Sequence, residues 1–285
     1  MHDKSTQAAN HDFVTNVRKT IDQSDILVIG DTCQDVYYAV QEGRNIPGST
    51  RAIDVVGLPV IEQGMASFVA SQVRELGPRV KLITSGKCTI ERYGDLVIRR
   101  PNTAPSERAI LAGIEQHKDE CHAVIVSDYN RGAITSKVME AIDQIALNMP
   151  VFIDPGRGKA DAFYGTKFRL SKRNQSELAD IGQTQRSGQY SLITGGWRGM
   201  WLTNNATQKT TFIPSIDVDA IDPTGCGDVC IATICCFVLA GANMLEACRA
   251  AAVAAGLKAT KQGCQPVTMQ EICAVFEQWS MQEVQ

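Results

Sequence analysis

The sequence lacks the features that are typical of membrane, secreted and nucleic-acid-binding proteins. Its 285 residues carry a formal net charge of −3, so no basic excess draws the chain to nucleic acid or to an anionic membrane. No apolar run is long enough to span a bilayer. The first residues, MHDKSTQAANHDF, have no apolar centre of the kind that a secretory signal needs. We therefore expect a cytoplasmic protein that binds neither nucleic acid nor membranes, with residues 1–12 disordered.

The sequence also lacks a cysteine pattern that would indicate metal or disulfide chemistry. It has ten cysteines but no CxxC pair, and most of them lie inside apolar segments, as Cys230, Cys235 and Cys236 do. Cysteines in such segments usually act as small buried apolar residues. His117 and His122 have no ligand spacing. We expect reduced thiols and no cysteine or histidine metal site.

The chain instead contains short apolar runs that alternate with helical patterns. Helical spacing needs apolar residues every three or four positions, whereas a buried strand reads as a short continuous apolar run. The runs predict strands at residues 25–30, 123–128, 151–156 and 191–196, and the spacing predicts helices at 65–76, 135–147, 175–181 and 243–260. This alternation favours an α/β fold with a mostly parallel sheet and helices on both faces.

Two segments break this alternation. Residues 36–60 and 88–100 read as strands without a helix between them, and we expect them to form a small antiparallel lid at one edge of the main domain. No repeat, low-complexity tract or charge block divides the chain. Residues 1–285 are therefore interpreted as a single domain that carries a small β lid.

Polar residues follow several of the predicted strands directly. In open parallel sheets, ligands bind at the carboxyl ends of the strands. This rule places Asp31, Asp128, Asp154 and the turn at residues 194–196 around one candidate site.

The stretch AIDPTGCGDVCIA, residues 220–232, places two glycines and an aspartate where a helix begins. Glycine lets the backbone approach a ligand closely, and the free amides of a helix N-terminus bind anions such as phosphate. Asp228 could then accept a proton from an attacking hydroxyl group. On these residues alone, an ordinary loop with Asp228 favouring the helix dipole is an equal alternative. The stretch is not a Walker A loop, because no Gly-Lys-Ser/Thr follows.

Taken with its context, DPTGCGD resembles the DTxGAGD motif of the ribokinase/PfkB family of carbohydrate kinases. Among these the chain looks closest to the kinase domain of heptose-phosphate kinases, which act on D-glycero-D-manno-heptose 7-phosphate. Further segments resemble family motifs in the same order along the chain: ILVIGDTCQD, VSDYNRGAIT, VFIDPGRG, NQSE at 174–177, LITGGWRGM and AAVAAGLKATKQGCQPVT. The resemblance covers the kinase half of those proteins and not their nucleotidyltransferase half.

The resemblance implies a ribokinase-like fold and an ATP- and Mg²⁺-dependent kinase that phosphorylates a hydroxyl group of a sugar or sugar phosphate. Asp228 would be the catalytic base, and Gly225, Cys226 and Gly227 would form an anion hole. The implied nucleotide-binding residues are Asn174, Glu177, Thr194, Gly195, Gly199 and Gly263, with Glu177 also holding magnesium through water. The implied substrate-binding residues are Asp31, Asp35 and Gly64. A monovalent cation such as K⁺ near the Asp222 loop, and a homodimer formed through the lid, are also implied. As an alternative, Asn174 and Glu177 could simply begin a helix.

The departures from the family pattern lie mainly on the substrate side. The family element GGAANVAxNIAxLG corresponds to GMASFVASQVRELG at 64–77, so that Met65 replaces a glycine and Phe68 replaces an asparagine that contacts the sugar. Phenylalanine cannot make the hydrogen bonds of an amide. The segment after Gly86 is also short. These departures leave two alternatives open: a kinase for a nucleoside or another small alcohol, and a degenerate member that binds nucleotide or sugar without catalysis.

Cys226 stands where the family motif has alanine, and Pro223 where it has threonine. A thiol at a helix N-terminus could be reactive, or the cysteine could be a small residue that fits. Its main-chain amide remains available to an anion hole in either case.

Overall fold

The computed structural model describes residue 17 and residues 20–43, 53–94, 96–165, 167–181 and 188–282. Residues 1–12 and residues 44–52 of the expected lid lie outside the described residues. No helix among those described is long and apolar enough to cross a membrane.

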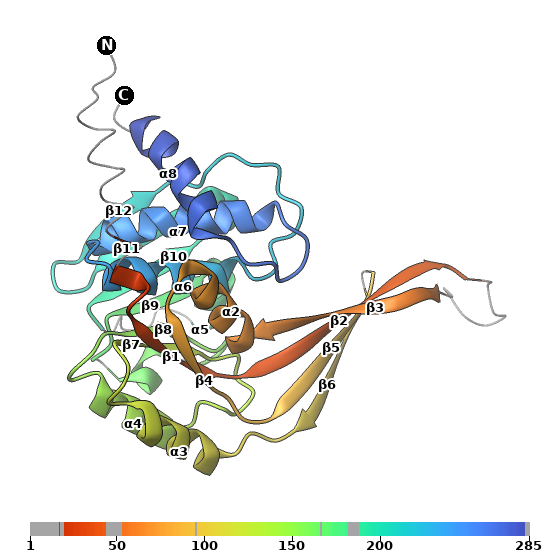
Figure 1. Ribbon diagram of the computed structural model, residues 1–285, viewed down its shortest axis with the longest axis horizontal. Coiled ribbons are helices and arrows are strands. Elements are labelled where there is room, and N and C mark those ends of the chain that lie inside the picture. The colour runs from red at the N-terminus through yellow and green to blue at the C-terminus, as the bar shows by residue number, and fades with distance from the viewer. Residues whose placement is uncertain are drawn as a thin grey trace.

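The main sheet has eight strands in the order β12-β11-β10-β9-β8-β7-β1-β4 (Figure 1). Strands β4, β1, β7, β8, β9 and β10 run parallel to one another, and β11 and β12 extend the sheet beyond β10 as antiparallel strands. The strands are β1 (Asp25–Gly30), β4 (Arg79–Ile83), β7 (Ala123–Ser127), β8 (Val151–Asp154), β9 (Leu170–Asn174), β10 (Tyr190–Thr194), β11 (Met200–Asn204) and β12 (Lys209–Ile213). The predicted α/β fold with a mostly parallel sheet is therefore confirmed.

Strand β1 shows why its residues form a central strand. All six of its residues are buried, which is typical of a parallel strand that is covered on both faces. Ile26 and Val28 face one core, and Leu27 and Ile29 face the other. The two-residue alternation of a strand thus sends apolar side chains into two separate layers.

Helices cover both faces of the main sheet. The helices α2 (Ala66–Leu76), α6 (Cys226–Leu239) and α7 (Met244–Ala259) contribute to one core, which α8 (Met269–Gln282) also joins. On the other face lie α3 (Glu107–His117), α4 (Ser136–Ile145) and the short turn η1 (Asp161–Tyr164). The helix α5 (Gln175–Ile181) follows β9, and the turn η2 (Gly196–Arg198) follows β10.

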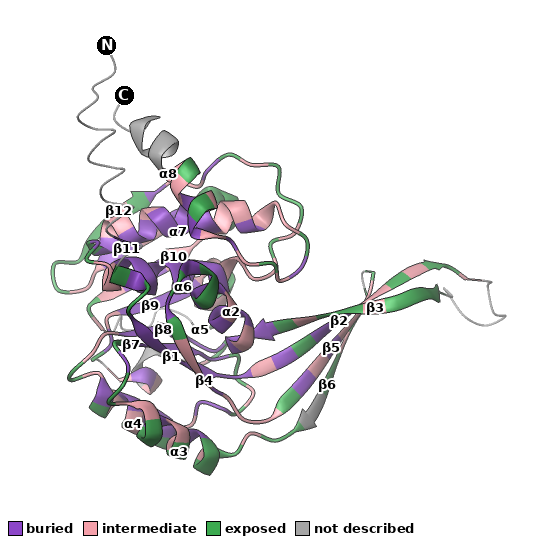
Figure 2. Ribbon diagram, viewed as in Figure 1, coloured by how far each residue is buried: buried purple, intermediate pink, exposed green. Residues whose placement is uncertain are grey.

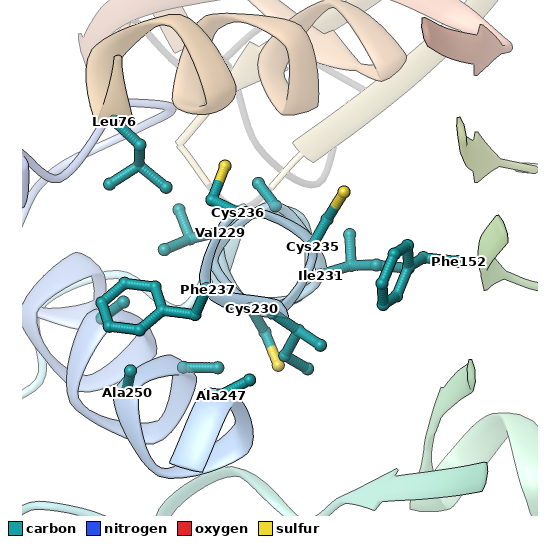
Figure 3. Close-up of a cluster of buried hydrophobic side chains, with 14 of the residues drawn as sticks. Leu76, Phe152, Val229, Cys230, Ile231, Cys235, Cys236, Phe237, Ala247 and Ala250 are labelled. Carbon is teal, nitrogen blue, oxygen red and sulfur yellow. The ribbon is translucent and has the colours of Figure 1, made fainter. Parts of the chain in front are cut away.

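Helix α6 is buried around most of its circumference (Figure 3). A helix with apolar residues on all sides is typical of a protein interior. The cysteines along it pack as small apolar side chains, as expected, and none of the ten cysteines, each within the described residues, forms a disulfide bond. The side chains labelled around α6 come from α2 (Leu76), β8 (Phe152), α7 (Ala247, Ala250) and α6 itself.

Two helix starts follow directly from local sequence. The side chain of Thr135 accepts the amide of Val138 at 3.3 Å and caps α4. Asn243 and Glu246 cap α7 reciprocally. Because capping side chains replace the partners that the first helical amides lack, these two helices begin close to their predicted positions.

The lid is a second sheet that projects from the main body (Figures 1 and 2). It has the order β3-β2-β5-β6, formed by β2 (Thr32–Glu42), β3 (Ile53–Met65), β5 (Lys87–Tyr93) and β6 (Leu96–Thr103). The expectation of a purely antiparallel lid is wrong, because β2 and β5 pair in parallel. Between β3 and β5 the chain passes through α2 and β4 of the main body, and it re-enters the lid in the direction of β2.

Candidate active site

The candidate site lies where the carboxyl ends of β1, β7, β8 and β9 meet the N-terminus of α6. Asp31 follows β1, Asp128 follows β7, and Asp154 ends β8. Parallel neighbours bring these ends to one edge of the sheet, as the sequence predicts. Their carboxylates nevertheless differ in what surrounds them, and this difference decides their roles.

Helix α6 begins with two glycine amides that have no main-chain acceptor within the described residues. Gly225 has a φ of +82° and no side chain caps the helix. The amide of Cys226 donates to the carbonyl oxygen of Pro223 at 3.2 Å. Of the three amides proposed from the sequence for an anion hole, those of Gly225 and Gly227 are therefore the ones left for a ligand. The unpaired amides of a helix N-terminus attract an anion.

Both glycines lie where a side chain would collide with a neighbour. A Cβ at Gly225 would lie 2.4 Å from Cε1 of Phe68, and a Cβ at Gly227 would lie 2.7 Å from Nζ of Lys172. Residue 225 must also adopt a positive φ, which glycine does without strain. The local sequence thus fixes the backbone tightly over Phe68 and Lys172.

Asp228 is 4% exposed, and its Oδ1 accepts the Tyr129 hydroxyl group at 2.8 Å. Burial raises the pKa of its carboxyl group to about 7, and the nearby charge of Asp154 adds to the rise. The Lys172 ammonium and the bond from Tyr129 oppose it. A carboxylate with a pKa near neutrality accepts a proton well from a reacting hydroxyl group.

Lys172 is a site residue that the sequence reasoning missed. Its Nζ lies 2.6 Å from Oδ2 of Asp154, and both side chains are buried. Burial raises the pKa of Asp154 to about 6, although Lys172 works in the opposite direction. Burial disfavours the ammonium, but the charge of Asp154 prevails and raises the pKa of Lys172. A buried cation is thereby held beneath the first turn of α6.

Asn174 and Glu177 cap the start of α5 reciprocally. The Asn174 Oδ1 atom accepts the amide of Glu177 at 2.9 Å, and Glu177 Oε2 accepts the amide of Asn174 at 2.9 Å. This is the helix-start alternative that the sequence left open. The second carboxylate oxygen of Glu177 takes no part in these two capping hydrogen bonds. The charge of Glu177 also acts on Asp154, which places Glu177 at the edge of the candidate site.

The turn after β10 is tight. The amide of Gly195 donates to the carbonyl oxygen of Gly199 at 2.8 Å. A Cβ at Gly199, whose φ is +93°, would lie 2.5 Å from the Ile213 carbonyl oxygen. Thr194 donates its hydroxyl group to the carbonyl oxygen of Arg173 at 3.3 Å. The glycines of this turn leave its main chain open, while the Trp197 side chain is exposed to solvent.

Asp31 and Asp128 serve the loop that follows β7. The Asp31 carboxylate accepts the amides of Tyr129, Arg131 and Ala133 at 2.9–3.1 Å. That of Asp128 accepts Lys159 Nζ and the Tyr164 hydroxyl group, each at 2.7 Å. Both carboxylates are occupied by the protein itself, so the predicted contact between Asp31 and a sugar finds no support in this geometry.

Asp35 and Gly64 form the base of the lid. Asp35 is paired with Arg92 at 2.8 Å, and its Oδ2 accepts the Cys33 thiol at 3.4 Å. A Cβ at Gly64 would lie 2.5 Å from that same Oδ2. A glycine at position 64 is therefore required for Asp35 to lie under β3, and this requirement is independent of any contact that the two residues make with a ligand.

Met65 and Phe68 fill space at the junction of lid and body. Met65 has a φ of +58° and a ψ of −137°, a conformation that normally belongs to glycine. Its side chain is buried and packs in a small cluster with Cys33, Cys88 and Ile90. Phe68 is 1% exposed beneath Gly225. The two residues make this side of the site apolar.

Arg131 lies at the same junction. Its positive charge opposes the rise that burial causes in the pKa of Cys88. The guanidinium forms no ion pair with any of the described residues. An unpaired guanidinium beside the site suits a phosphate or carboxylate group on a ligand.

The loop after α7 closes another side of the site. The amide of Gly263 donates to Oδ2 of Asp222 at 2.8 Å, and the amide of Cys264 donates to Oε2 of Glu62 in the lid at 2.5 Å. The loop is thereby linked both to the segment before α6 and to strand β3.

Burial raises the pKa of Cys226 to about 11, so its thiol stays protonated at neutral pH and packs as a small side chain.

Comparisons with known proteins give one family and one fold. The family model described as pfkB family carbohydrate kinase matches residues 105–271. The protein named "Bifunctional protein HldE" from Trichlorobacter lovleyi is 26% identical over 70% of this chain and 44% of its own length. The protein of the same name from Caulobacter vibrioides is 28% identical over 76% of this chain and 48% of its own length. The chain spans about half the length of these curated relatives.

The solved structures that resemble the chain share its fold at low identity. Phosphofructokinase-2 from Escherichia coli, in complex with potassium, has a TM-score of 0.70 and 14% identity, over 90% of this chain and 99% of its own. Ribokinase from Thermotoga maritima has a TM-score of 0.70 and 17% identity over the same shares. A Burkholderia thailandensis nucleoside kinase bound to inosine has a TM-score of 0.64 and 21% identity, over 90% and 98%.

Proposed function

Because the chain belongs to the pfkB family of carbohydrate kinases, we propose that it transfers the terminal phosphoryl group of ATP to a hydroxyl group of a sugar or sugar phosphate, in the manner of a heptose-phosphate kinase. The observation that carries this proposal is the placement of Asp228. A buried carboxylate whose pKa is raised to about 7 lies in the first turn of a helix whose N-terminal glycine amides are free.

In the proposed reaction, Asp228 accepts the proton of the attacking hydroxyl group. The amides of Gly225 and Gly227 hold the negative charge that develops on the transferred group. Lys172 adds a fixed positive charge beneath this turn. Tyr129 holds one oxygen of Asp228 with its hydroxyl group, which orients the carboxylate. Each of these residues acts by placing charge or accepting a proton, which is what phosphoryl transfer needs from a protein.

The residues suit a nucleotide that brings magnesium with it. Mg²⁺ in kinases is usually bound through one or two carboxylates together with phosphate oxygens and water. Among the described residues no cluster of three or more His, Cys, Asp or Glu side chains could hold a metal ion by itself, and Glu177 offers one free carboxylate oxygen. Magnesium, when bound, would neutralise phosphate charge. Three groups of residues are proposed to border the nucleotide. They are the pair Asn174 and Glu177, the turn with Thr194, Gly195 and Gly199, and the loop that contains Gly263.

A monovalent cation fits this protein poorly. The family resemblance predicts one near the Asp222 loop, and a similar structure is a potassium complex. Here the ammonium group of Lys258 is already bonded to the main-chain oxygen of Asp222. No step of the proposed reaction is therefore assigned to potassium.

The acceptor would bind between the lid and the body, near Asp35 and Gly64. Arg131 is proposed to hold a negatively charged group of this acceptor, such as the phosphate of a sugar phosphate. The apolar packing of Met65 and Phe68 supports a second candidate, a nucleoside or another small alcohol with fewer hydroxyl groups. A third candidate, a degenerate member that binds nucleotide or sugar without transfer, is suggested by the short segment after Gly86.

We also propose that the chain forms a homodimer through its lid and works in the cytoplasm, where ATP is available. Apolar side chains are exposed along β3 and at the start of β6 of the lid, the sheet in which Figure 2 colours many positions as exposed. Apolar surface of this kind marks interaction sites, and light scattering would measure the mass of the assembly. The exposed apolar residues are Ile53, Val55, Val56, Leu58, Val60, Ile61, Leu96 and Val97.

ATP consumption in the presence of sugars, sugar phosphates and nucleosides tests the proposal. We expect one class of acceptor to be phosphorylated, and Asp228→Asn to lower kcat by a factor of about 10²–10⁴ while nucleotide affinity changes little. Nucleotide binding without phosphorylation of any acceptor, together with no effect of Asp228→Asn, would support the non-catalytic candidate.

A further inference from the structure

Lys258 is a fully buried lysine that the proposed reaction does not use. It lies in the last turn of α7 and is 0% exposed. Its Nζ atom donates to the carbonyl oxygens of Asp222 at 3.2 Å and Lys261 at 3.1 Å. Within the described part of the chain it forms no ion pair. Since a buried ammonium group is costly unless its surroundings compensate it, this arrangement needs a reason.

The oxygens around Lys258 belong to the two loops that border the nucleotide side of the site. The segment before α6 is held to the end of α7, because the Ala259 carbonyl oxygen accepts the amides of Ile221 and Asp222 at 2.7 and 2.9 Å. The Asp222 carboxylate joins the loops again by accepting the amides of Thr224 and Gly263 at 2.9 and 2.8 Å. Main-chain and carboxylate oxygens therefore converge at the point where both loops meet.

A convergence of this kind suits a cation. The carbonyl groups at a helix C-terminus carry partial negative charge, and rings of main-chain carbonyl oxygens are what proteins use to bind potassium. Here the chain brings its own cation to these oxygens. The Lys258 ammonium also acts across the site, since it opposes the effect of burial on Cys226 in the first turn of α6.

We infer that the Lys258 ammonium takes the place of a monovalent cation at this junction, so that nucleotide binding and phosphoryl transfer by this chain do not depend on potassium. The inference rests on the proposed kinase function for its catalytic part. Its structural part is that Lys258 holds the 221–225 segment and the 260–264 loop together. This part depends only on the hydrogen bonds of Lys258 and of these two loops.

The first test uses the full-length wild-type chain and its best acceptor in potassium, sodium and choline chloride. At matched ionic strength, rates are expected to agree within about twofold, because nonspecific screening is then equal. A rate that is about tenfold higher in potassium than in choline chloride would overturn the inference.

Variants of the lysine test the same point from the other side. Lys258→Ala removes the ammonium group and leaves space, so its rate in choline chloride should fall about tenfold or more, because fixed charge is lost beside the site. Potassium or ammonium ions should restore part of that loss. Lys258→Met fills the space with an apolar chain and should show the loss without the rescue. An unaltered Lys258→Ala rate in choline chloride would overturn the inference.

Lys261 offers a matched control. It lies on the same loop, but its Nζ bonds to the carbonyl oxygen of Pro266 at 2.8 Å and to the carboxylate of Glu271 at 2.8–3.0 Å. Lys261→Ala should therefore gain no response that is specific to potassium. A potassium response equal to that of Lys258→Ala would show a general effect of lost charge and would count against the inference.

Thermal unfolding in the same salts, with and without MgADP, gives a readout that is independent of catalysis. The Tm of the wild-type chain should not distinguish potassium from choline, whereas potassium should raise the Tm of Lys258→Ala by binding the folded state. A wild-type Tm that potassium alone raises would overturn the inference even if no acceptor is phosphorylated. If Lys258→Ala does not fold, the Tm of the wild-type chain in potassium and in choline chloride still tests the inference. Absence of all kinase activity, by contrast, refutes the proposed function and leaves this melting result intact.

Discussion

Replacing the proposed base by its uncharged isostere should stabilise the folded chain at alkaline pH. The carboxyl group of Asp228 is buried, and its pKa is raised from an ordinary 3.8 to about 7. A carboxyl group that holds its proton more tightly in the folded state than in the unfolded state takes stability away as the pH rises between the two values. Below about pH 4 nothing is lost, and above about pH 7 the loss is complete.

The size of the effect follows from that interval. One pKa unit corresponds to about 1.4 kcal/mol, so an interval of roughly three units costs the folded state about 4 kcal/mol at full ionisation. Relaxation around Asp154 and Lys172 reduces this figure, and we expect a gain of about 2–4 kcal/mol for Asp228→Asn at about pH 8. For a domain of this size the gain corresponds to a Tm that is about 3–7 °C higher.

Urea or thermal unfolding of both proteins at about pH 5.5 and about pH 8 measures this difference. The gain at the lower pH should be about half of the gain at the higher pH, because about half of the titration interval has then been crossed. Asp119→Asn is the control. It removes an exposed carboxylate beyond the end of α3, on the opposite face of the sheet from α6, and should show no such gain. An Asp228→Asn protein that is no more stable than the wild type at the higher pH would refute the buried, strained state of this acid.

Other substitutions test the remaining parts of the site. The kcat of the wild-type chain should rise with pH and level off above about pH 7, because Asp228 must lose its proton to act as a base; a flat profile between about pH 5.5 and 8 would contradict this role. Lys172→Met leaves a buried carboxylate without its partner and should lower the free energy of unfolding by about 3–5 kcal/mol, which chemical denaturation would reveal. Arg131→Met should raise the KM for a phosphorylated acceptor at least about tenfold and Arg131→Lys much less, whereas equal KM values would exclude an anionic group at this position. Gly225→Ala should destabilise the chain by about 1–3 kcal/mol, since residue 225 has a positive φ and its Cβ would overlap Phe68; unchanged stability would mean that the loop is freer than its geometry indicates.

The sequence predicts those parts of the fold that depend on local patterns. Buried strands such as β1 read as short apolar runs, and Thr135 and Asn243 mark helix starts through their own side chains. The strand ends at Asp31, Asp128 and Asp154 are equally readable, because Asp or Gly follows each run. These features need only a few neighbouring residues to be specified.

The sequence could not predict how charges pair inside the fold. Lys172 lies 18 residues from Asp154 and Lys258 lies 36 residues from Asp222, and each lysine sits in a segment whose neighbours give no sign of a buried charge. The parallel pairing of β2 with β5 was missed for a similar reason, since it depends on the path of the chain through the main body. Met65 adopts a glycine-like conformation where the lid and α2 meet, and the glycine of the family element at this position is the one sign of it in the sequence.

The way in which five acids around the site, Asp31, Asp128, Asp154, Asp222 and Asp228, are compensated also explains why Asp228 is the one suited to act as a base. The Asp31 carboxylate accepts three amides and that of Asp222 accepts two. Asp154 has the Lys172 ammonium at 2.6 Å, and Asp128 has Lys159 at 2.7 Å. Among the residues that the structure describes, the one hydrogen-bond donor to the Asp228 carboxylate is a neutral hydroxyl group, that of Tyr129, while Asp154 repels its charge. The pKa of Asp154 is raised as well, to about 6, but a buried ammonium group lies against its carboxylate. Asp228 is therefore the least compensated of these five acids, and it lies in the helix turn where a phosphate would bind. A protein that needed Asp228 only for stability would gain by placing an ammonium group or main-chain amides against its carboxylate, as it does at the other four.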